Sequence, residues 1–304
     1  MAKVAVAVKP GAPVKEESKE LTQSQGQELT AAELEELVAD AGAGLSTSAD
    51  DNIVPFIVLL QDMSPEVKKR DPNYVEGAEP GMYMDRATKK LWAGDEAMAE
   101  RTELPQLEFQ HCYFDRQVVE WIPRNDGGGF VARFPLKGTI EDTMKAIGGK
   151  QVTDPQDPNK KIWKTADGLH DLIDTRYHFG NVVSDNGIRA AVIAFSSTGH
   201  TASRQWMTTM NEFKVIDPST GQPVRSPAGT PLSLPAWSRK YRIGTKPREN
   251  NKGSFFVATV ADAGMIRDAY VRAAGKALHD GAKAGIISAS ADEATHGTAA
   301  SDEI

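Results

Sequence analysis

The chain has 304 residues and a net charge of −7, and 40% of its residues are hydrophobic, which is typical of a globular protein with a sizeable core. Its apolar stretches are far shorter than the roughly 20 residues that cross a membrane, and residues 1–9 lack the apolar region of a signal peptide. A single cysteine, Cys112, excludes an internal disulfide and a cysteine-rich metal site, so the composition predicts a soluble protein of a reducing cytoplasm with no membrane partner.

Residues 1–50 are predicted to form a disordered, acidic N-terminal segment. They carry nine acidic residues against four lysines and contain no aromatic residue. Such a segment cannot bury enough apolar area to offset the entropy that ordering costs. Thr30 and Glu33 form a capping box ahead of Leu34, Leu37 and Val38, so a short helix is expected within the segment.

The folded body is expected at residues 51–280, and its first half shows the patterns of β-strands. Alternating apolar and polar residues predict strands at 107–113, 117–123 and 130–134, and a hairpin is predicted around 82–92. Residues 138–170 have the composition of a long insertion, and the sequence assigns them no role.

Two hairpins are expected in the second half of the body. The first joins residues 176–183 to residues 189–195 through Asn186-Gly187, a pair that suits a type I′ turn. The second joins residues 236–245 to residues 254–260 through a long loop.

Two helices are expected beside these hairpins. One begins at Ser197 or Thr198 and places Trp206 and Met210 on one apolar face, so Trp206 is expected in the core. The other spans roughly residues 262–279 and is amphipathic.

The fold class predicted from these elements is β-rich α+β. Several short strands, polar turns that contain glycine, and few helices favour a barrel or a sandwich. Residues 281–304 are rich in Ala, Ser, Gly and Thr and carry four acidic residues against one lysine, so a flexible acidic C-terminal tail is expected there.

The acidity of the chain is concentrated at its two ends, and one region of the body is basic. Residues 201–260 carry nine Lys or Arg residues against three acidic residues. Local charge, and not the total, decides whether a phosphate backbone can bind. The net charge therefore does not exclude a nucleic-acid partner.

Cations and aromatic rings are interleaved in two clusters, and a single-stranded nucleic acid needs both, for its phosphates and for its bases. The larger cluster consists of Trp237, Arg239, Lys240, Tyr241, Arg242, Lys246, Arg248, Lys252 and Phe255. The smaller cluster consists of Trp121, Arg124, Phe130 and Arg133.

The same residues also fit an ordinary structural role. Trp237, Tyr241 and Ile243 alternate along one strand and share one face, as core residues do. Phe255 and Phe256 point to opposite faces, so only one of them can face a ligand. The basic residues are equally expected on a solvated face that binds nothing. The cluster as a whole is a more specific sign of nucleic-acid binding than any one of its residues.

The sequence contains no strong catalytic motif, and no enzyme activity, cofactor or metal is expected. Glu212-Phe213-Lys214 matches the E-x-K element of metal-dependent nucleases, in which acids hold magnesium and the lysine steadies the attacking hydroxide or the phosphate. Phe213, however, continues the apolar face that begins at Trp206. A nuclease is therefore kept as an alternative only.

Three segments resemble a family of tailed-bacteriophage single-stranded-DNA-binding proteins. The likeness covers about residues 51–280 and leaves both ends uncovered. It is carried by Val54–Ile57, Leu60-Gln61, Ser64–Val67, Tyr74–Ala78 and Pro80-Gly81, by Val119–Arg124 with the glycines and Phe130-Val131, and by Asn251–Phe256.

This resemblance implies an OB-like antiparallel β-barrel that binds a single strand across one face. It also implies a role in replication or recombination in the cytoplasm of an infected host cell. The tail that ends Asp302-Glu303-Ile304 would then recruit replication or recombination proteins, although it lacks the terminal aromatic residue common in such tails.

A structural or assembly protein of the phage particle is the main alternative function. It would use the same β-rich body as a packing surface and the same termini as assembly tails.

Overall fold

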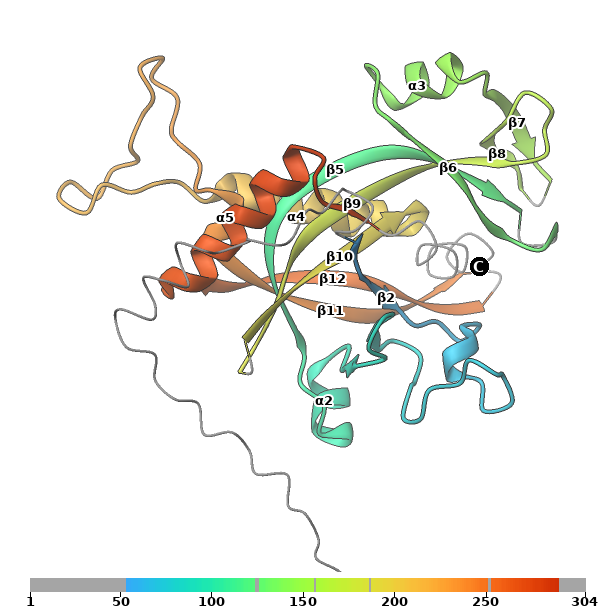
Figure 1. Cartoon of the computed structure of the whole chain (residues 1–304), viewed down its shortest axis with the longest axis horizontal. Coiled ribbons are helices and arrows are strands. Elements are labelled where there is room, and N and C mark those ends of the chain that lie inside the picture. The colour runs from blue at the N-terminus through green and yellow to red at the C-terminus, as the bar shows by residue number, and fades with distance from the viewer. Residues whose placement is uncertain (1–52, 124–125, 156, 186, 251–252, 290–304) are drawn as a thin grey trace, which may run out of the picture. The chain divides into compact units, whose positions relative to one another are not determined.

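The computed structural model describes residues 53–123, 126–155, 157–185, 187–250 and 253–289 (Figure 1). These residues form a β-rich α+β unit, which confirms the predicted class. The predicted disordered segment 1–50 and its expected helix lie outside the described residues.

The described residues contain thirteen β-strands and four α-helices. The strands are β1 (Ile53–Val54), β2 (Phe56–Leu59), β3 (Tyr83–Asp85), β4 (Leu91–Trp92), β5 (Leu107–Ile122), β6 (Gly129–Pro135), β7 (Lys150–Asp154), β8 (Asp157–Lys164), β9 (Asp171–Ser184), β10 (Gly187–Ser196), β11 (Arg239–Asn250), β12 (Gly253–Met265) and β13 (Ser288–Ala289). The helices are α2 (Glu96–Thr102), α3 (Ile140–Ala146), α4 (His200–Glu212) and α5 (Ala269–Lys283).

One large sheet, strongly curled, organises the unit (Figure 1). Its strands follow the order β12-β11-β5-β9-β10-β2-β3-β4, with β6 beside β5 and the β7–β8 hairpin beside β9. The described pairings in this sheet are antiparallel except that of β10 with β2. They form an open path whose two ends are β12 and β4.

Both predicted hairpins and the hairpin around residues 82–92 are confirmed, but β5 differs from the prediction. Two strands were expected at 107–113 and 117–123, because Asp115 and Arg116 interrupt the apolar alternation. They form one strand of 16 residues instead. Arg116 makes a bidentate pair with Asp174 of β9, at 2.7 and 2.6 Å, so the polar residues stay within the ladder.

The expected loop at residues 246–253 is also mostly strand. Lys246 pairs with Val257 and Arg248 with Phe255, so β11 continues to Asn250. β5 pairs with β11 only at Lys240–Ile243. Pro247 therefore lies beyond the central pairing, at the kind of strand edge where proline is tolerated.

The insertion at residues 138–170 folds as α3 followed by the β7–β8 hairpin. Met144 of α3 packs with Val118 of β5 and Leu172 of β9 in a small apolar cluster. This cluster fixes the insertion to the large sheet. The capping box of Thr139 and Asp142 begins α3.

Helix α4 begins at His200, close to the predicted start, and confirms the expected core position of Trp206, which is 0% exposed. Its indole packs against Phe109 and Tyr241. Helix α5 begins seven residues later than predicted, because β12 extends to Met265.

Helix α5 begins at an N-cap whose removal should have a modest cost. Oδ1 of Asp268 accepts hydrogen bonds from the backbone N–H groups of Tyr270 (2.7 Å) and Val271 (3.1 Å). Asp268→Ala leaves both donors without this acceptor, so we expect the free energy of unfolding to fall by about 1 kcal/mol. Urea unfolding followed by circular dichroism measures the change. Asp268→Asn is the control, because it keeps a capping oxygen and should cost much less.

The folded unit extends past residue 280, where the tail was expected to begin. α5 runs to Lys283, and β13 pairs in parallel with β1, with Ser288 opposite Ile53 and Ala289 opposite Val54. The remainder of the predicted tail, residues 290–304, lies outside the described residues.

Candidate nucleic-acid interface

The β11–β12 hairpin carries most of the larger predicted cluster, and its two faces differ. Residues directly opposite in an antiparallel pair share a face, and successive residues alternate between faces. Arg242, Lys246 and Arg248 therefore lie on one face, together with Phe255, which pairs with Arg248. We call these four residues the hairpin row.

The opposite face of the hairpin belongs to the core. Tyr241 is 1% exposed and Ile243 is 0% exposed, and burial raises the pKa of Tyr241 to about 12. The interpretation of Tyr241 as a core residue is confirmed, because its ring leaves no free surface on which a base can stack.

The first three cations of the predicted cluster are paired with carboxylates from elsewhere in the sheet. Arg239 Nε donates to Oδ1 of Asp262 at 2.8 Å, and its guanidinium lies over the ring of Phe213. Lys240 pairs with Glu108 at 2.5 Å, and Arg242 lies 4.0 Å from the same carboxylate. The charges of Arg239 and Lys240 are therefore largely balanced by neighbouring carboxylates.

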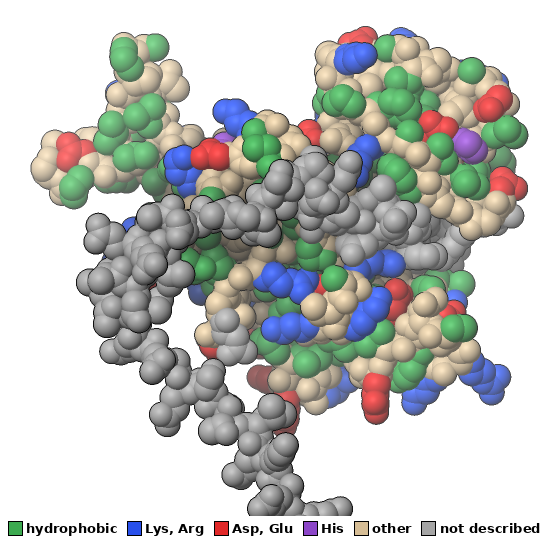
Figure 2. Space-filling model, viewed as in Figure 1, with side chains coloured by type: hydrophobic (Ala, Val, Ile, Leu, Met, Phe, Trp, Pro, Cys, Tyr) green, Lys and Arg blue, Asp and Glu red, His purple; other side chains and the backbone are tan. Residues whose placement is uncertain are grey.

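The outer part of the hairpin row is more accessible. Lys246 and Arg248 are exposed, and Phe255 is half-buried. Lys252, between the two strands, lies outside the described residues. Figure 2 shows Lys and Arg side chains gathered near the middle of the viewed face, over the sheet.

Trp237 lies apart from the hairpin row. Its ring is half-buried and packs against His279 of α5, with 4.7 Å between the ring centroids. Its backbone carbonyl accepts a hydrogen bond from Gln110 of β5. These contacts make Trp237 a packing residue between β5 and α5.

The smaller predicted cluster is also built into the fold. Trp121 is 5% exposed and meets Phe130 edge to face, with 5.9 Å between the ring centroids. Arg133 lies over the ring of Phe130 and donates from Nη2 to the carbonyl of Ala289 at 2.6 Å. Arg133 thus holds the β13 segment in place. Arg124 lies outside the described residues.

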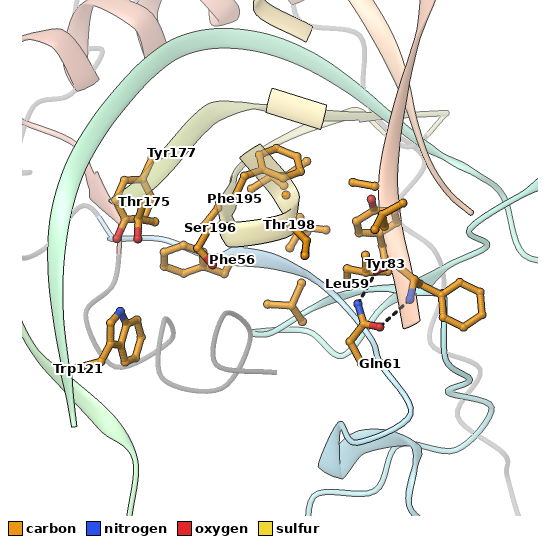
Figure 3. Close-up of a pocket in the computed structure, with 18 residues that line it drawn as sticks. Phe56, Leu59, Gln61, Tyr83, Trp121, Thr175, Tyr177, Phe195, Ser196 and Thr198 are labelled. Carbon is orange, nitrogen blue, oxygen red and sulfur yellow. Dashed lines mark hydrogen bonds between the residues drawn. The ribbon is translucent and has the colours of Figure 1, made fainter. Parts of the chain in front are cut away.

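Trp121 also lines a cleft whose walls are mostly aromatic and aliphatic. Figure 3 shows Trp121 and Tyr177 with Phe56 toward one end of the cleft, and Tyr83 with Gln61 toward the other. The cavity measures about 70 Å³.

Gln61 fastens the hairpin beside this cleft. Its side-chain amide donates to the carbonyl of Phe256 and accepts from the N–H of the same residue, both at 2.9 Å. A side chain that makes both bonds acts like one more rung of a β-ladder. The hairpin row is thus carried by a hairpin that is held both at β5 and at the segment just after β2.

A second groove, which the sequence did not predict, lies between the insertion and helix α4. Its cavity volume is about 470 Å³. Lys160, Lys161 and Trp163 of β8 line it on one side, and Ser197 and His200 line it on the other. Lys and Trp are interleaved at residues 160–164, and this was the only sign of the groove in the sequence. Nothing in the sequence indicated that this part of the insertion would lie against another element to form a groove.

The nuclease triplet lies at the C-terminal end of α4. Lys214 donates to the carbonyl of Asn211 and to Oγ of Ser233 at 2.9 Å. Glu212 is exposed at the end of α4. No group of three His, Cys, Asp or Glu side chains suited to a metal ion occurs among the residues that the structure describes.

Comparison with known proteins places the chain among phage proteins. The family model described as Pam3 phage gp34-like protein matches residues 24–288. The chain belongs to this family. No curated protein and no solved structure matches this gp34-like chain. The phage origin implied by the resemblance is thus confirmed, whereas the family description names no activity.

No helix in the described part of this gp34-like chain is long and apolar enough to cross a membrane.

Proposed function

We propose that this phage protein binds single-stranded DNA along the hairpin row and coats strands exposed during replication or recombination in the host cytoplasm. The observation that carries the proposal is the placement of Arg242, Lys246 and Arg248 on one face of a projecting hairpin, with Phe255 opposite Arg248. Cations for phosphates and a ring for a base thus occur side by side, as single-strand binding requires.

The spacing of the row supports the proposal. Alternate residues of a strand lie about 6.7 Å apart, so Lys246 and Arg248 are positioned to meet successive phosphates of an extended strand. Neither cation reads a base edge, so binding should show little sequence preference.

The proposal includes the OB-like character that the resemblance implies. The curled sheet would present the β11–β12 hairpin beside its concave side, as a partly open barrel does. We further propose that the protein has no catalytic activity, and that the acidic residues beyond Ala289 recruit replication or recombination proteins.

Neutralising the accessible cations should weaken binding to a single strand. Lys246→Gln with Arg248→Gln removes two phosphate contacts, so we expect affinity for oligo-dT to fall about tenfold at low salt. The slope of log K against log salt should also become shallower by about 1.4, because each phosphate contact on a single strand contributes about 0.7. Fluorescence anisotropy of labelled oligo-dT, titrated at four salt concentrations, measures both quantities.

A matched control separates this effect from a change in net charge. Lys69→Gln with Arg70→Gln also removes one Lys and one Arg, both exposed, from a loop before β3. This variant should bind like the wild type. Equal losses in the two double variants would contradict a role for the hairpin row. A wild type that binds no oligo-dT at low salt would reject the proposal as a whole.

One observation favours a second candidate function, assembly of the phage particle. The segment between α4 and β11 extends away from the sheet as an arm (Figure 1). It is held by its own backbone hydrogen bonds, such as Val224 N–H to the carbonyl of Val215. It exposes Ile216 (51%) and Leu232 (41%). Mass spectrometry of purified particles tests this function, which requires many copies of the chain per particle.

A further inference from the structure

Two arginines face each other across the centre of the large sheet. Arg116 of β5 and Arg176 of β9 are directly opposite in the antiparallel register. Their side chains therefore share one face, since opposite residues lie about 4.5–5.5 Å apart at Cα. Like charges in this arrangement destabilise a sheet unless something neutralises them.

The carboxylate at this place neutralises only part of the charge. Asp174 makes its bidentate pair with Arg116, and Nε2 of His200 donates to the backbone carbonyl of Asp174 at 2.9 Å. Nε of Arg176 is buried and has no hydrogen-bond partner among the described residues.

A third arginine adds to the positive charge. Arg204 is exposed on the first turns of α4. Burial lowers the pKa of Arg176, and the charges of Arg116 and Arg204 lower it further. Arg204 also lies four residues after His200, on the same side of α4 as the histidine that contacts Asp174.

The groove beside α4 reaches Asp174, the carboxylate that pairs with Arg116. Asp174, His200 and Ser197 form one wall of its cavity. Ser197 has a φ of +44°, a left-handed conformation that is uncommon for serine and that tends to occur at functional sites. On the opposite wall, Lys160 and Lys164 are paired with Asp154 and Asp171, whereas Lys161 donates to Oγ1 of Thr153.

We propose that Arg176 and Arg204, with Arg116 beside them, bind a phosphate group next to this groove. A planar guanidinium fork fits phosphate oxygens in pairs, and phosphate has enough oxygens to engage more than one arginine. The N-terminal end of α4 adds favourable partial charge. The phosphate belongs either to a nucleic-acid strand, which rests on the proposed function, or to a free phosphate compound, which does not.

Thermal unfolding in inorganic phosphate tests the site. Tm in phosphate is compared with Tm in sodium chloride of equal ionic strength. We expect phosphate to raise Tm of the wild type by several degrees, about 3–6 °C at a concentration well above Kd. Arg176→Gln and Arg204→Gln should lose most of this rise, whereas Arg225→Gln, an exposed arginine in the arm, should keep it.

Both variants are expected to fold, so a lost phosphate effect would not be the result of unfolding. Arg204 is on the helix surface, so Arg204→Gln is expected to fold normally. Without phosphate, Arg176→Gln should melt no lower than the wild type, because it relieves the repulsion from Arg116. An equal phosphate-dependent rise in the wild type and both variants would overturn the proposal.

Binding of oligo-dT to the same variants identifies the source of the phosphate. If Arg204→Gln loses both the phosphate effect and several-fold affinity for oligo-dT, the site holds a phosphodiester. If only the phosphate effect is lost, the ligand is a free phosphate compound. If the wild type binds no oligo-dT but its phosphate effect depends on Arg204, the proposed function fails and the site stands.

Discussion

The free energy of unfolding should fall steeply as the pH is lowered from 6.5 to 4.5. The cause is a pair of buried histidines, His111 and His178, whose ring centroids lie 5.1 Å apart beneath Trp206 of α4. His178 stacks on this indole and bonds Oγ of Ser203 at 2.8 Å. Neither ring nitrogen of His111 has a hydrogen-bond partner among the described residues.

Burial keeps both histidines neutral in the folded protein. It lowers the pKa of His111 to about 3, with His279 adding to the effect, and it lowers the pKa of His178 well below the usual 6.5. Below pH 6.5 the unfolded chain therefore takes up two protons that the folded chain does not. Stability is fully present above pH 6.5 and is lost as the pH falls toward the folded-state values.

The expected loss is large compared with the stability of a typical domain. Each histidine contributes about 1.4 kcal/mol per pH unit, so the two together remove about 5 kcal/mol between pH 6.5 and 4.5. Stability of natural domains is about 5–15 kcal/mol. Urea unfolding at half-unit steps of pH, followed by tryptophan fluorescence, measures the slope.

His111→Leu isolates one of the two histidines. Leucine has nearly the volume of histidine, and no hydrogen bond is lost, so we expect the variant to fold and its slope to be about half that of the wild type. An unchanged slope in this variant would show that other groups, such as the carboxylates, cause the acid sensitivity.

Local patterns in the sequence predicted most of the elements, because alternation and turn chemistry act over a few residues. The hairpins, Trp206 in the core and the β-rich class all follow from such patterns. The two strands predicted around Asp115 are one strand, because the partner that satisfies Arg116 is Asp174, 58 residues away. Only the register of β5 against β9 brings the two together.

The same limit applies to the candidate sites. Residues 201–260 are basic in sequence, but Glu108 and Asp262, which lie outside that window, neutralise Lys240 and Arg239. Arg116, Arg176 and Arg204 are scattered along the chain, and their gathering depends on strand pairing and on the docking of α4. Charge in a sequence window therefore predicts a basic surface only after the cross-strand partners are known.

Gly94→Ala should destabilise the protein by about 3 kcal/mol or more, because it forces backbone segments apart. Gly94 lies where three segments meet: its carbonyl accepts from the N–H of Thr245 at 2.7 Å, and Thr245 Oγ1 donates to the carbonyl of Gly81 at 2.9 Å. A β-carbon at Gly94 would overlap both that carbonyl oxygen and Oγ1 of Thr245. The oxygen belongs to the backbone and cannot move by a simple rotation.

Gly229→Ala is the matched control for this substitution. Gly229 has a φ of +80° but nothing within 4 Å of an added β-carbon, so the cost is backbone strain alone, about 1–2 kcal/mol. Urea unfolding of both variants gives the comparison. Since Thr245 directly precedes Lys246, the contact at Gly94 also fixes the base of the hairpin row, and Gly94→Ala should weaken oligo-dT binding while Gly229→Ala should not. A Gly94→Ala protein as stable as Gly229→Ala would show that the three segments are not packed this closely.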